Sequence, residues 1–514
     1  MHTQTIWVLG DQLSPNNAAL TAADPASAVV LMIESKARGA LRHYHKKKLL
    51  LVYSAMRHFA NDLRQAGWTV DYHLLTDTPD FESGLKRHLE THHPTSIQLT
   101  EPNSFIETTA LKKLARKLNT DLTLLPTQQF LCPRADFLAW ASPRKRLLME
   151  DHYRRLRKQT CYLMQKNGEP VGGQWNFDHD NRKTFSDWHK AGRPTTPIPA
   201  LKPDTITREV AALIDTEFAD NPGTTENFSL PVDRHHALKW LDNFITHRLP
   251  TFGDYEDLMV STEPVLFHSL ISPLINLGLL TPQECAEKAI TAYENGHAPL
   301  PAVEGFVRQI IGWREYINGI YWLRGPDYAK ENALHAHRPL PDWFYHGNVP
   351  MSCLNHVLHQ VIDTGWNHHI QRLMILGNFC LLAGIRPDQT LRWFTEMYVD
   401  ANEWVMAANV VGMICHADGG LITTKPYAAG SAYINRMSDY CPSCQFDPKL
   451  KTGPQACPFN YLYWNFYDQH ADRFNNNPRT SMPVKNWLKR PPKDQQAVRD
   501  SATTFLKTWV PVPE

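Results

Sequence analysis

The sequence has no apolar run that approaches the roughly 20 residues needed to span a membrane, and it opens without the charged and apolar stretches of a signal peptide. Its formal net charge is only +1, so any binding to nucleic acid needs a local basic face. The nine cysteines lack the even spacing of a disulfide framework. We therefore expect a soluble protein of the reducing cytoplasm, without membrane contact and with no obligate protein partner evident.

Aromatic residues, in contrast, are abundant. The 514 residues include 15 Trp, 18 Tyr and 21 Phe, and 42% of the chain is hydrophobic, which is ample for a large core. No long low-complexity segment interrupts the chain. A chain of this length exceeds one ordinary core, so we expect two or more subdomains.

Short apolar runs alternate with helical periodicity through the first part of the chain. This alternation is typical of an α/β doubly wound parallel sheet, which we place over residues 1–130. Strands are predicted at residues 5–9, 28–33, 69–75, 96–99 and 122–125, and a helix is predicted at residues 46–67.

Polar residues follow the first two predicted strands. Gly10 and Asp11 come directly after the first strand, and Glu34 follows the second. Ligands of doubly wound sheets bind beyond the carboxyl ends of the strands, so these residues are candidates for a ligand site, with ordinary loop positions as the alternative. No Gly-x-Gly-x-x-Gly run is present, which argues against a standard dinucleotide site.

Periodicity weakens after the predicted sheet. Residues 172–186 show little regular pattern and residues 194–203 are rich in proline, so we interpret 131–231 as a long connector. Beyond it helical periodicity dominates to the end of the chain and strand patterns almost vanish. The remainder, 232–514, is therefore predicted to be a larger all-α C-terminal domain.

Four cysteines of the C-terminal half have a spacing that suits a metal centre. Cys441 and Cys444 form a Cys-x2-Cys pair, Cys457 follows shortly after, and Cys353 lies far upstream. Four thiolates form structural zinc sites and also hold iron-sulfur clusters, and spacing alone does not separate the two. Four unconnected core cysteines are the plain alternative, since free cysteine is often buried.

Four short motifs follow one another in the predicted all-α domain. They are Phe-His-Ser-Leu-Ile-Ser-Pro at 267–273, Gly-Trp-Arg-Glu-Tyr at 312–316, Trp-Asn-His-His-Ile-Gln-Arg at 366–372 and Ala-Ala-Asn at 407–409. In this order they resemble four motifs of the photolyase and cryptochrome family. These are the run that binds the FAD phosphates, the Trp-Arg-Glu-Phe motif, the His-His segment of eukaryotic (6-4) photolyases, and the run whose asparagine sits at flavin N5.

The four cysteines sharpen this resemblance, because their arrangement is similar to that of the bacterial iron-sulfur branch, the prokaryotic (6-4) photolyases. That branch implies a 4Fe-4S cluster on the cysteines, a catalytic FAD and a 6,7-dimethyl-8-ribityllumazine antenna. The implied activity is light-driven reversal of (6-4) photoproducts in UV-damaged DNA. A cryptochrome-like blue-light photoreceptor with the same cofactors is one alternative, and a zinc-stabilised nucleic-acid binding module is another.

The resemblance also implies roles for single residues. His369 is the expected acid, helped by His368, because a histidine near its reference pKa can hold or give a proton at neutral pH. Glu315 is expected to accept hydrogen bonds from a base edge of the flipped lesion. Core histidines and an ordinary ion pair are the plain alternatives. The implied cofactor contacts are His268, Ser269, Ile271, Ser272, Arg314, Arg372 and Asn409.

Aromatic residues supply further candidates, each with ordinary core packing as the alternative. Tyr427 and Tyr433 are expected at the rim of the lesion pocket, because exposed rings are stacking platforms for unpaired bases. Trp393 is the expected entry point for electrons, with Tyr345 and Tyr398 as relays.

The sequence departs from the family pattern at two positions. Leu373 stands where eukaryotic (6-4) enzymes have a second histidine, so acid catalysis must depend on the His-His pair before it. Met413 stands where common photolyases have the first tryptophan of their electron path, so any photoreduction path must begin elsewhere. We further expect the cluster to be a structural staple, since metal binding contributes folding free energy.

Overall fold

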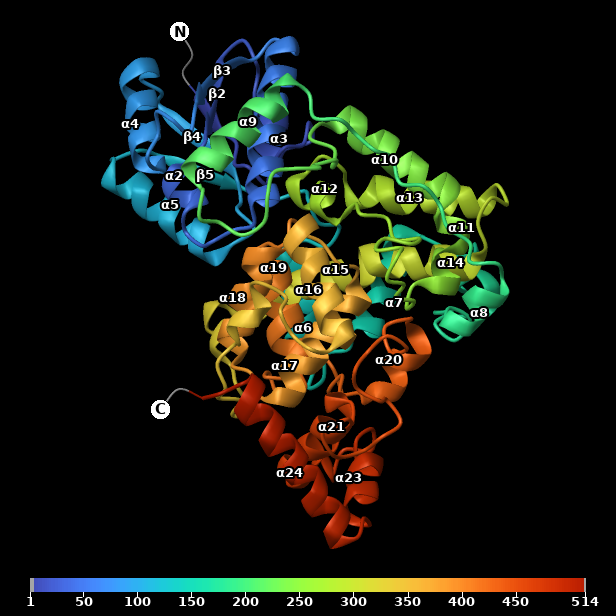
Figure 1. Cartoon of the computed structure of the whole chain (residues 1–514). Coiled ribbons are helices and arrows are strands. Elements are labelled where there is room, and N and C mark those ends of the chain that lie inside the picture. Colours follow the sequence, from blue (N-terminus) through green and yellow to red (C-terminus); the bar gives the residue numbers. More distant parts are fainter. Residues whose placement is uncertain (1–3, 513–514) are drawn as a thin grey trace.

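The structure, a computed structural model, describes residues 4–512 and contains a sheet domain and a larger helical domain (Figure 1). The sheet domain has five parallel strands in the order β3-β2-β1-β4-β5. Because β1 is central and the chain crosses from β3 to β4 on its other side, the predicted doubly wound sheet is confirmed. The strands are β1 (Gln4–Trp7), β2 (Ala28–Ile33), β3 (Thr69–His73), β4 (Ser96–Thr100) and β5 (Leu122–Leu125).

Helices cover both faces of this sheet, which is why its inner strands are apolar throughout. All six residues of β2 are buried, and successive side chains point to opposite faces. Leu31 packs in one cluster with Leu85 and Leu111 of α4 and α5, whereas Val30 belongs to the core that contains α3. The helices of this domain are α1 (Ala18–Thr21), α2 (Lys36–Gly39), α3 (Lys46–Gln65), α4 (Phe81–His92) and α5 (Phe105–Lys117).

The segment interpreted as a connector contains several short helices, and two of these pack on the two domains. One of them, α9, packs on α3 of the sheet domain, and α7 packs on η2 of the helical domain. The segment therefore clamps the two domains together, while the boundaries at residues 130 and 231 stay predictions. Its helices are α6 (Arg134–Ala141), α7 (Met149–Thr160), η1 (Val171–Gly173), α8 (Phe185–Lys190) and α9 (Thr205–Glu217).

The helical domain confirms the predicted all-α architecture, since no strand of a sheet follows β5 within residues 4–512. Prolines begin several of its helices, where the missing N–H has no cost. Its first half comprises α10 (Arg234–His247), α11 (Leu249–Tyr255), α12 (Ser272–Leu277), α13 (Pro282–Glu294), α14 (Leu300–Val307), η2 (Arg308–Trp313), α15 (Arg314–Arg324), η3 (Pro326–Lys330), η4 (Asp342–Phe344) and α16 (Ser352–Thr364).

The second half of this domain ends in a lobe that projects away from the sheet domain (Figure 1). Its helices α21 and α24 pack on each other, and α23 packs on α21. The elements are η5 (Gln371–Gly377), α17 (Asn378–Ala383), α18 (Pro387–Met397), α19 (Glu403–Ala407), η6 (Ala408–Ile414), α20 (Ser431–Met437), α21 (Pro458–Gln469), α22 (Ala471–Phe474), α23 (Ser481–Leu488) and α24 (Pro492–Trp509).

A buried lysine joins the two domains. Lys48 of α3 donates to the backbone carbonyls of Thr395, at 3.0 Å, and Ala401, at 2.6 Å. Burial lowers the pKa of Lys48 to about 7, with the Arg38 charge acting in the same direction. The contact fixes the turn between α18 and α19 against the sheet domain.

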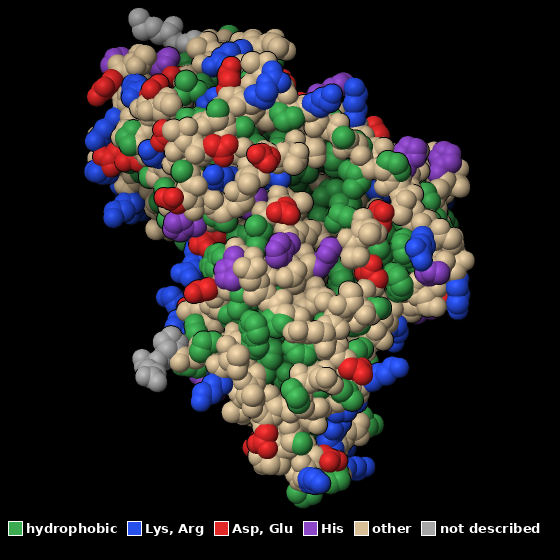
Figure 2. Space-filling model, in the orientation of Figure 1, with side chains coloured by type: hydrophobic (Ala, Val, Ile, Leu, Met, Phe, Trp, Pro, Cys, Tyr) green, Lys and Arg blue, Asp and Glu red, His purple; other side chains and the backbone are tan. Residues whose placement is uncertain are grey.

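The surface carries no single dominant charge on the face drawn in Figure 2, where basic and acidic side chains are interspersed and hydrophobic side chains show in a central hollow. This distribution agrees with the net charge of +1. None of the helices within residues 4–512 is long and apolar enough to cross a membrane.

Candidate functional site

A cavity of about 940 Å³ lies within the helical domain. Its size falls in the range of about 300–1,000 Å³ that is typical of small-molecule and cofactor sites. The three π-helical segments of the described chain, η2, η5 and η6, all contribute to its wall. Such widened turns are rare and frequently occur at functional sites. They place Trp313, Arg372 and Asn409 around one space.

Asp400 organises the polar side of this cavity. Its carboxylate accepts two hydrogen bonds from the Arg372 guanidinium, at 2.9 and 3.1 Å, and one from the Ser272 hydroxyl at 2.6 Å. Its backbone carbonyl accepts from the Asn276 side-chain amide, whose oxygen accepts from Arg314. Burial alone would raise the pKa of Asp400, but the Arg372 charge and these donors hold it below its ordinary value.

Seven motif residues named from the sequence as cofactor contacts meet at this cavity. They come from the loop before α12, from the start of α12 and from the three π-helical segments or the helix that follows them. Asn409 donates from its side-chain amide to the Val405 carbonyl, which orients the amide within η6. The seven are His268, Ser269, Ile271, Ser272, Arg314, Arg372 and Asn409.

Two stacked histidines present unpaired nitrogens at the cavity. The rings of His268 and His368 lie 4.5 Å apart at an angle of 12°. Nε2 of His268 and Nδ1 of His368 are buried and have no hydrogen-bond partner among the described residues. Burial, together with neighbouring positive groups, lowers the pKa of His268 to about 3 and that of His368 well below its ordinary value. Two neutral imidazoles are thus available to a polar ligand.

His369 faces the cavity, where its side chain is exposed. Desolvation by the surrounding protein, with the Arg372 charge, lowers its pKa to about 4. Its role as the acid stays a prediction. His369 becomes an acid at neutral pH only if negative charge enters the cavity beside it.

The structure places Glu315 elsewhere, which corrects its expected contact with a base edge. Glu315 does not line the cavity, and its two carboxylate oxygens accept from the backbone N–H groups of Leu131, at 3.1 Å, and Cys132, at 2.9 Å. Burial raises the pKa of Glu315 to about 7, with the two N–H groups opposing. Its chain neighbours Trp313 and Arg314 line the cavity instead.

Two carboxylates that carry no sequence motif do line the cavity. Burial raises the pKa of Glu256 to about 8, opposed by Arg308, and raises that of Asp257 to about 6, opposed by Arg182. The sequence gave no spacing that singles out either residue. Asp400 had a weak signal, because a lone carboxylate between apolar segments needs a buried partner.

The expected rim residues Tyr427 and Tyr433 line the cavity, on the segment that follows η6 and on α20. Burial raises the pKa of Tyr433 above its ordinary value, and the neighbouring Asp257 acts in the same direction. Lys425 and Arg182 line the same side, so basic and aromatic groups adjoin there. Arg182 belongs to the connector, which therefore reaches the site.

Two of the candidate electron-transfer residues lie beside the cavity wall. Phe394 lines the cavity, and its ring centroid lies 5.2 Å from that of Trp393 and 5.4 Å from that of Tyr398. The Tyr398 hydroxyl donates to the cavity residue Asn367 at 2.7 Å. Trp393 is fully buried and Tyr345 is 36% exposed, and the roles of the three residues in electron transfer stay predictions.

At the carboxyl end of the sheet, the Glu34 side chain is hydrogen-bonded within the protein, which corrects its expected role as a ligand contact. Its carboxylate accepts from Arg57 at 2.7 and 3.0 Å, from the Tyr72 hydroxyl at 2.6 Å and from the Leu75 N–H at 2.9 Å. These contacts use the roughly four acceptor positions of a carboxylate, and the residue is 0% exposed. No acceptor capacity is left for a ligand.

The other two candidates, Gly10 and Asp11, are half-buried and follow β1 at its carboxyl end. Burial raises the pKa of Asp11 to about 7, the Glu107 charge adds to this and the Arg38 charge opposes it. Gly10 lies so close to α3 that a Cβ there would be 3.0 Å from Val52. Their role in ligand binding stays a prediction.

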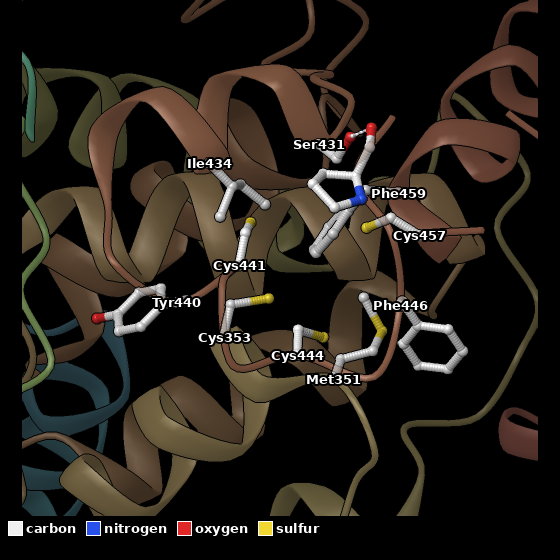
Figure 3. A pocket seen from close by; sticks show the side chains of 11 residues that line it. Met351, Cys353, Ser431, Ile434, Tyr440, Cys441, Cys444, Phe446, Cys457 and Phe459 are labelled. Carbon is white, nitrogen blue, oxygen red and sulfur yellow. Dashed lines mark hydrogen bonds between the residues drawn. The ribbon is translucent and has the colours of Figure 1, made fainter. Parts of the chain in front are cut away.

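The four cysteines meet in one small pocket between the start of α16 and the segment that leads into α21 (Figure 3). Burial raises the pKa of Cys441 to about 11 and that of Cys457 to about 12, so without a cation both are protonated thiols at neutral pH. Met351 and Phe459 also line this pocket, which shields it from water. The alternative of four unconnected core cysteines is therefore wrong.

Fold and site together define a two-domain protein with a cofactor-sized cavity in its helical domain. The deoxyribodipyrimidine photo-lyase-related protein family matches residues 6–230. The chain is 43% identical over 509 residues to a (6-4) photolyase of Agrobacterium fabrum (strain C58 / ATCC 33970), over 98% of this chain and 99% of that protein. A solved bacterial class III photolyase from Agrobacterium tumefaciens shares the fold, with a TM-score of 0.53 and 15% identity over 97% of this chain and 98% of that one. The chain belongs to the (6-4) photolyase family.

Membership of this family implies a flavin cofactor and a DNA substrate. The cavity fits a flavin on three observations of its own. It has the necessary volume, it presents buried unpaired nitrogens of His268 and His368, and it holds the ionised pair of Arg372 and Asp400.

Proposed function

We propose that this protein reverses (6-4) pyrimidine-pyrimidone photoproducts in UV-damaged DNA, driven by light, with reduced FAD bound in the helical-domain cavity. The observation that carries the proposal is the convergence of His369, Asn409 and the Arg372–Asp400 pair on one cavity in a chain with full-length similarity to a (6-4) photolyase. None of the sequence motifs supports this reaction by itself, because their residues must meet at one cavity to act together.

Residues of the polar side would hold the cofactor. Ser272 donates its O–H to Asp400 and keeps its oxygen as an acceptor, while Asn276 fixes Arg314, so the remaining guanidinium donors of Arg314 are in place before binding. Asn409 presents its amide from η6, where Val405 orients it. When bound, reduced FAD supplies an electron after it absorbs light. The remaining chemistry is the placement and protonation of the lesion.

His369 is proposed to hold the proton that the lesion needs. Its pKa of about 4 in the protein alone leaves the imidazole neutral at pH 7. Entry of an anionic cofactor and of DNA phosphates would raise this pKa, because a negative neighbour favours the imidazolium. His369 would then be protonated, and able to act as an acid, only when the cofactor and DNA are bound. In the protein alone it would stay neutral.

The rim beside this histidine is proposed to bind the flipped nucleotides. Tyr427 and Tyr433 supply ring faces, and Lys425 and Arg182 supply positive charge for phosphates. Extrusion of a damaged base costs a few kcal/mol, which stacking on such rings offsets. Binding at this rim should therefore weaken as salt rises.

We propose that the four cysteines hold a 4Fe-4S cluster with a structural role. The four thiols meet in one pocket, and their arrangement along the chain resembles that of the bacterial iron-sulfur branch, which supports an iron-sulfur cluster over a single zinc ion. The pocket joins α16 to the segment before α21, so a cluster there ties the C-terminal lobe to the rest of the helical domain. Iron and sulfide analysis of purified protein tests this, and stoichiometric zinc without iron would refute it.

A 6,7-dimethyl-8-ribityllumazine antenna is proposed for the carboxyl edge of the sheet. Asp11 and Arg38 supply polar groups there, whereas Glu34 is not part of this proposal because protein donors occupy it. Acid extraction of the protein and chromatography of the released chromophores tests the assignment. Another chromophore, or flavin alone, would refute it.

Electron entry is proposed to run from Tyr345 at the surface through Trp393 and Phe394 to the cavity. Support comes from the ring contact of 5.2 Å between Trp393 and Phe394 and from the place of Phe394 in the wall. Tyr398 adjoins both rings and contacts Arg372 through its face, 4.0 Å from the guanidinium carbon.

The repair function is tested with purified, chemically reduced protein and an oligonucleotide that carries one (6-4) photoproduct. Illumination should restore the two original pyrimidines, and the matched dark sample should not. An oligonucleotide with a cyclobutane dimer is the specificity control. If the (6-4) lesion persists under light while flavin is bound and reduced, the repair function is wrong and the photoreceptor alternative gains support.

A further inference from the structure

A second group of possible metal ligands lies in the sheet domain, far in sequence from the cysteine pocket. Asp71 and His73 stand two residues apart on β3, so their side chains share one face of the sheet. His88 and His92 stand four residues apart on α4, so they share one face of the helix. The helix covers that face of the sheet, and the four side chains meet between them.

Their atoms converge on one carboxylate oxygen. Oδ2 of Asp71 lies 2.6 Å from Nδ1 of His88, 3.2 Å from Nε2 of His73 and 3.4 Å from Nε2 of His92. The ligand atoms of Asp71, His73 and His88 all lie within 4.8 Å of one another, and His92, outside this set, completes it by a shift of its side chain. Tetrahedral zinc with bonds of about 2.0–2.1 Å needs ligand atoms roughly 3.3 Å apart, so two of the three separations already fit and the His88 contact needs only a small opening.

A hydrogen bond to the far nitrogen of His88 is a further feature that this cluster shares with metal sites. Thr5 of β1 lies 2.7 Å from Nε2 of His88 through its hydroxyl oxygen, which turns Nδ1 toward Asp71. Metal-bound histidines usually hydrogen-bond through their other nitrogen in this way.

We propose that Asp71, His73, His88 and His92 bind one divalent cation of the zinc class. Three imidazoles and a carboxylate are the donor set that zinc prefers when thiolates are absent. His73 and His88 are buried, whereas the side chains of Asp71 and His92 are 22% and 24% exposed, so the ion has a path from solvent. The site would pin the edge strand β3 to α4 and stabilise the sheet domain.

The test uses the full-length protein with its native cofactors, dialysed against a mild chelator and then titrated with ZnCl2 in a calorimeter. Wild type should bind one equivalent that His88→Gln and Asp71→Asn lose. Thr5→Val should keep the equivalent but bind it about 10-fold to 100-fold more weakly, since it removes only the supporting hydrogen bond. His93→Asn is the matched control, because His93 is the exposed histidine next to the cluster and should leave binding unchanged.

A second measurement uses wild type alone, in case a variant fails to fold. Crystals soaked in ZnCl2 should show an anomalous peak at the zinc edge between Asp71 and His88. The proposal is overturned if this position stays empty while zinc binds elsewhere, or if folded His88→Gln and wild type bind equal amounts. Either result would make the four residues a hydrogen-bonded cluster only.

Discussion

The helical-domain cavity and the sheet edge both contain buried polar groups, but they differ in how these groups are paired. In the cavity, the nitrogens of His268 and His368 are buried and unpaired. At the sheet edge, Glu34 accepts four hydrogen bonds from protein donors. Because an unpaired buried polar group is costly, it persists where a ligand completes it, whereas a fully paired group serves the fold. Here the unpaired His268 and His368 nitrogens line the cavity and are free for a ligand, whereas Glu34 has its acceptor positions filled by the protein.

Loss of the cysteine centre should have the largest effect on stability, and only the helical domain should be destabilised. Structural metal sites contribute on the order of 10 kcal/mol, which approaches the whole stability of a domain. Cys441→Ala should therefore give flavin-free protein whose C-terminal lobe is digested rapidly, while the sheet domain stays protected. Limited proteolysis followed by mass spectrometry measures this. Soluble, flavin-loaded Cys441→Ala protein without activity would instead favour a redox role for the cluster.

A pair of charge-removing variants compares the two regions directly. Asp400→Asn leaves Arg372 uncompensated in the cavity and should weaken flavin binding about 100-fold, since breaking a buried pair costs about 3 kcal/mol. Glu34→Gln should lower the free energy of unfolding by a similar amount, about 3 kcal/mol, and leave flavin binding intact. Flavin titration and thermal unfolding of both variants provide the measurements.

The comparison between the two regions would fail if the two variants showed the opposite effects. If Glu34→Gln released flavin or antenna at unchanged thermal stability, Glu34 would be a ligand contact after all. If Asp400→Asn only lowered stability, the cavity network would be structural.

His152 offers a smaller test, because its two ring nitrogens are buried and unpaired outside the cavity. Burial lowers its pKa to about 3 from 6.5, so between these values the unfolded chain binds the extra proton. Its contribution is thus fully present above pH 6.5 and is lost as pH falls through this window. His152→Leu should remove up to about 2 kcal/mol of the stability loss between pH 6.5 and 5. Denaturant unfolding at both pH values measures the difference.

The exposed His297 supplies the control for this test, and His297→Gln should leave the pH dependence unchanged. An unchanged pH dependence in His152→Leu would mean that His152 has a partner, such as a bound molecule. Unpaired buried nitrogens would then indicate ligands outside the cavity as well.

The smallest expected effect concerns the path for electrons. Trp393→Phe should slow flavin photoreduction several-fold while flavin content stays constant, because phenylalanine is much harder to oxidise than tryptophan. Trp487→Phe, at a buried position in the C-terminal lobe, is the matched control and should have no effect. Transient absorption after a laser flash measures both rates, and equal rates in Trp393→Phe and wild type would remove Trp393 from the path.

Periodicity predicted the fold well, because burial pattern and element type are local properties. The strand at 28–33 was placed to the residue, and the helix predicted at 46–67 is observed as Lys46–Gln65. The connector at 131–231 stays a prediction, and the helices within it, such as α7 and α9, are stabilised by packing that no periodicity reveals.

Most cavity residues were predicted through a motif, and Tyr427 and Tyr433 were predicted from their ring chemistry alone. His268, Arg372 and Asn409 reach the cavity as expected, but Glu315 and Glu34 are held by backbone and arginine donors that no sequence pattern reveals. Pairing depends on long-range contacts, and a carboxylate looks the same in sequence whether it is paired or free. The group of possible metal ligands on β3 and α4 was missed for the same reason. Its residues lie on two separate elements, and only the fold brings the pair on the strand to the pair on the helix.

The most direct test of the account compares wild type with His369→Asn at equal flavin occupancy, measuring restored pyrimidines per absorbed photon on a (6-4) oligonucleotide. A positioned general acid contributes at least about 100-fold, so His369→Asn should retain flavin and DNA binding and lose nearly all repair. Repair at the wild-type yield in His369→Asn would contradict the assignment of the proton to this residue and with it the proposed chemistry of the cavity.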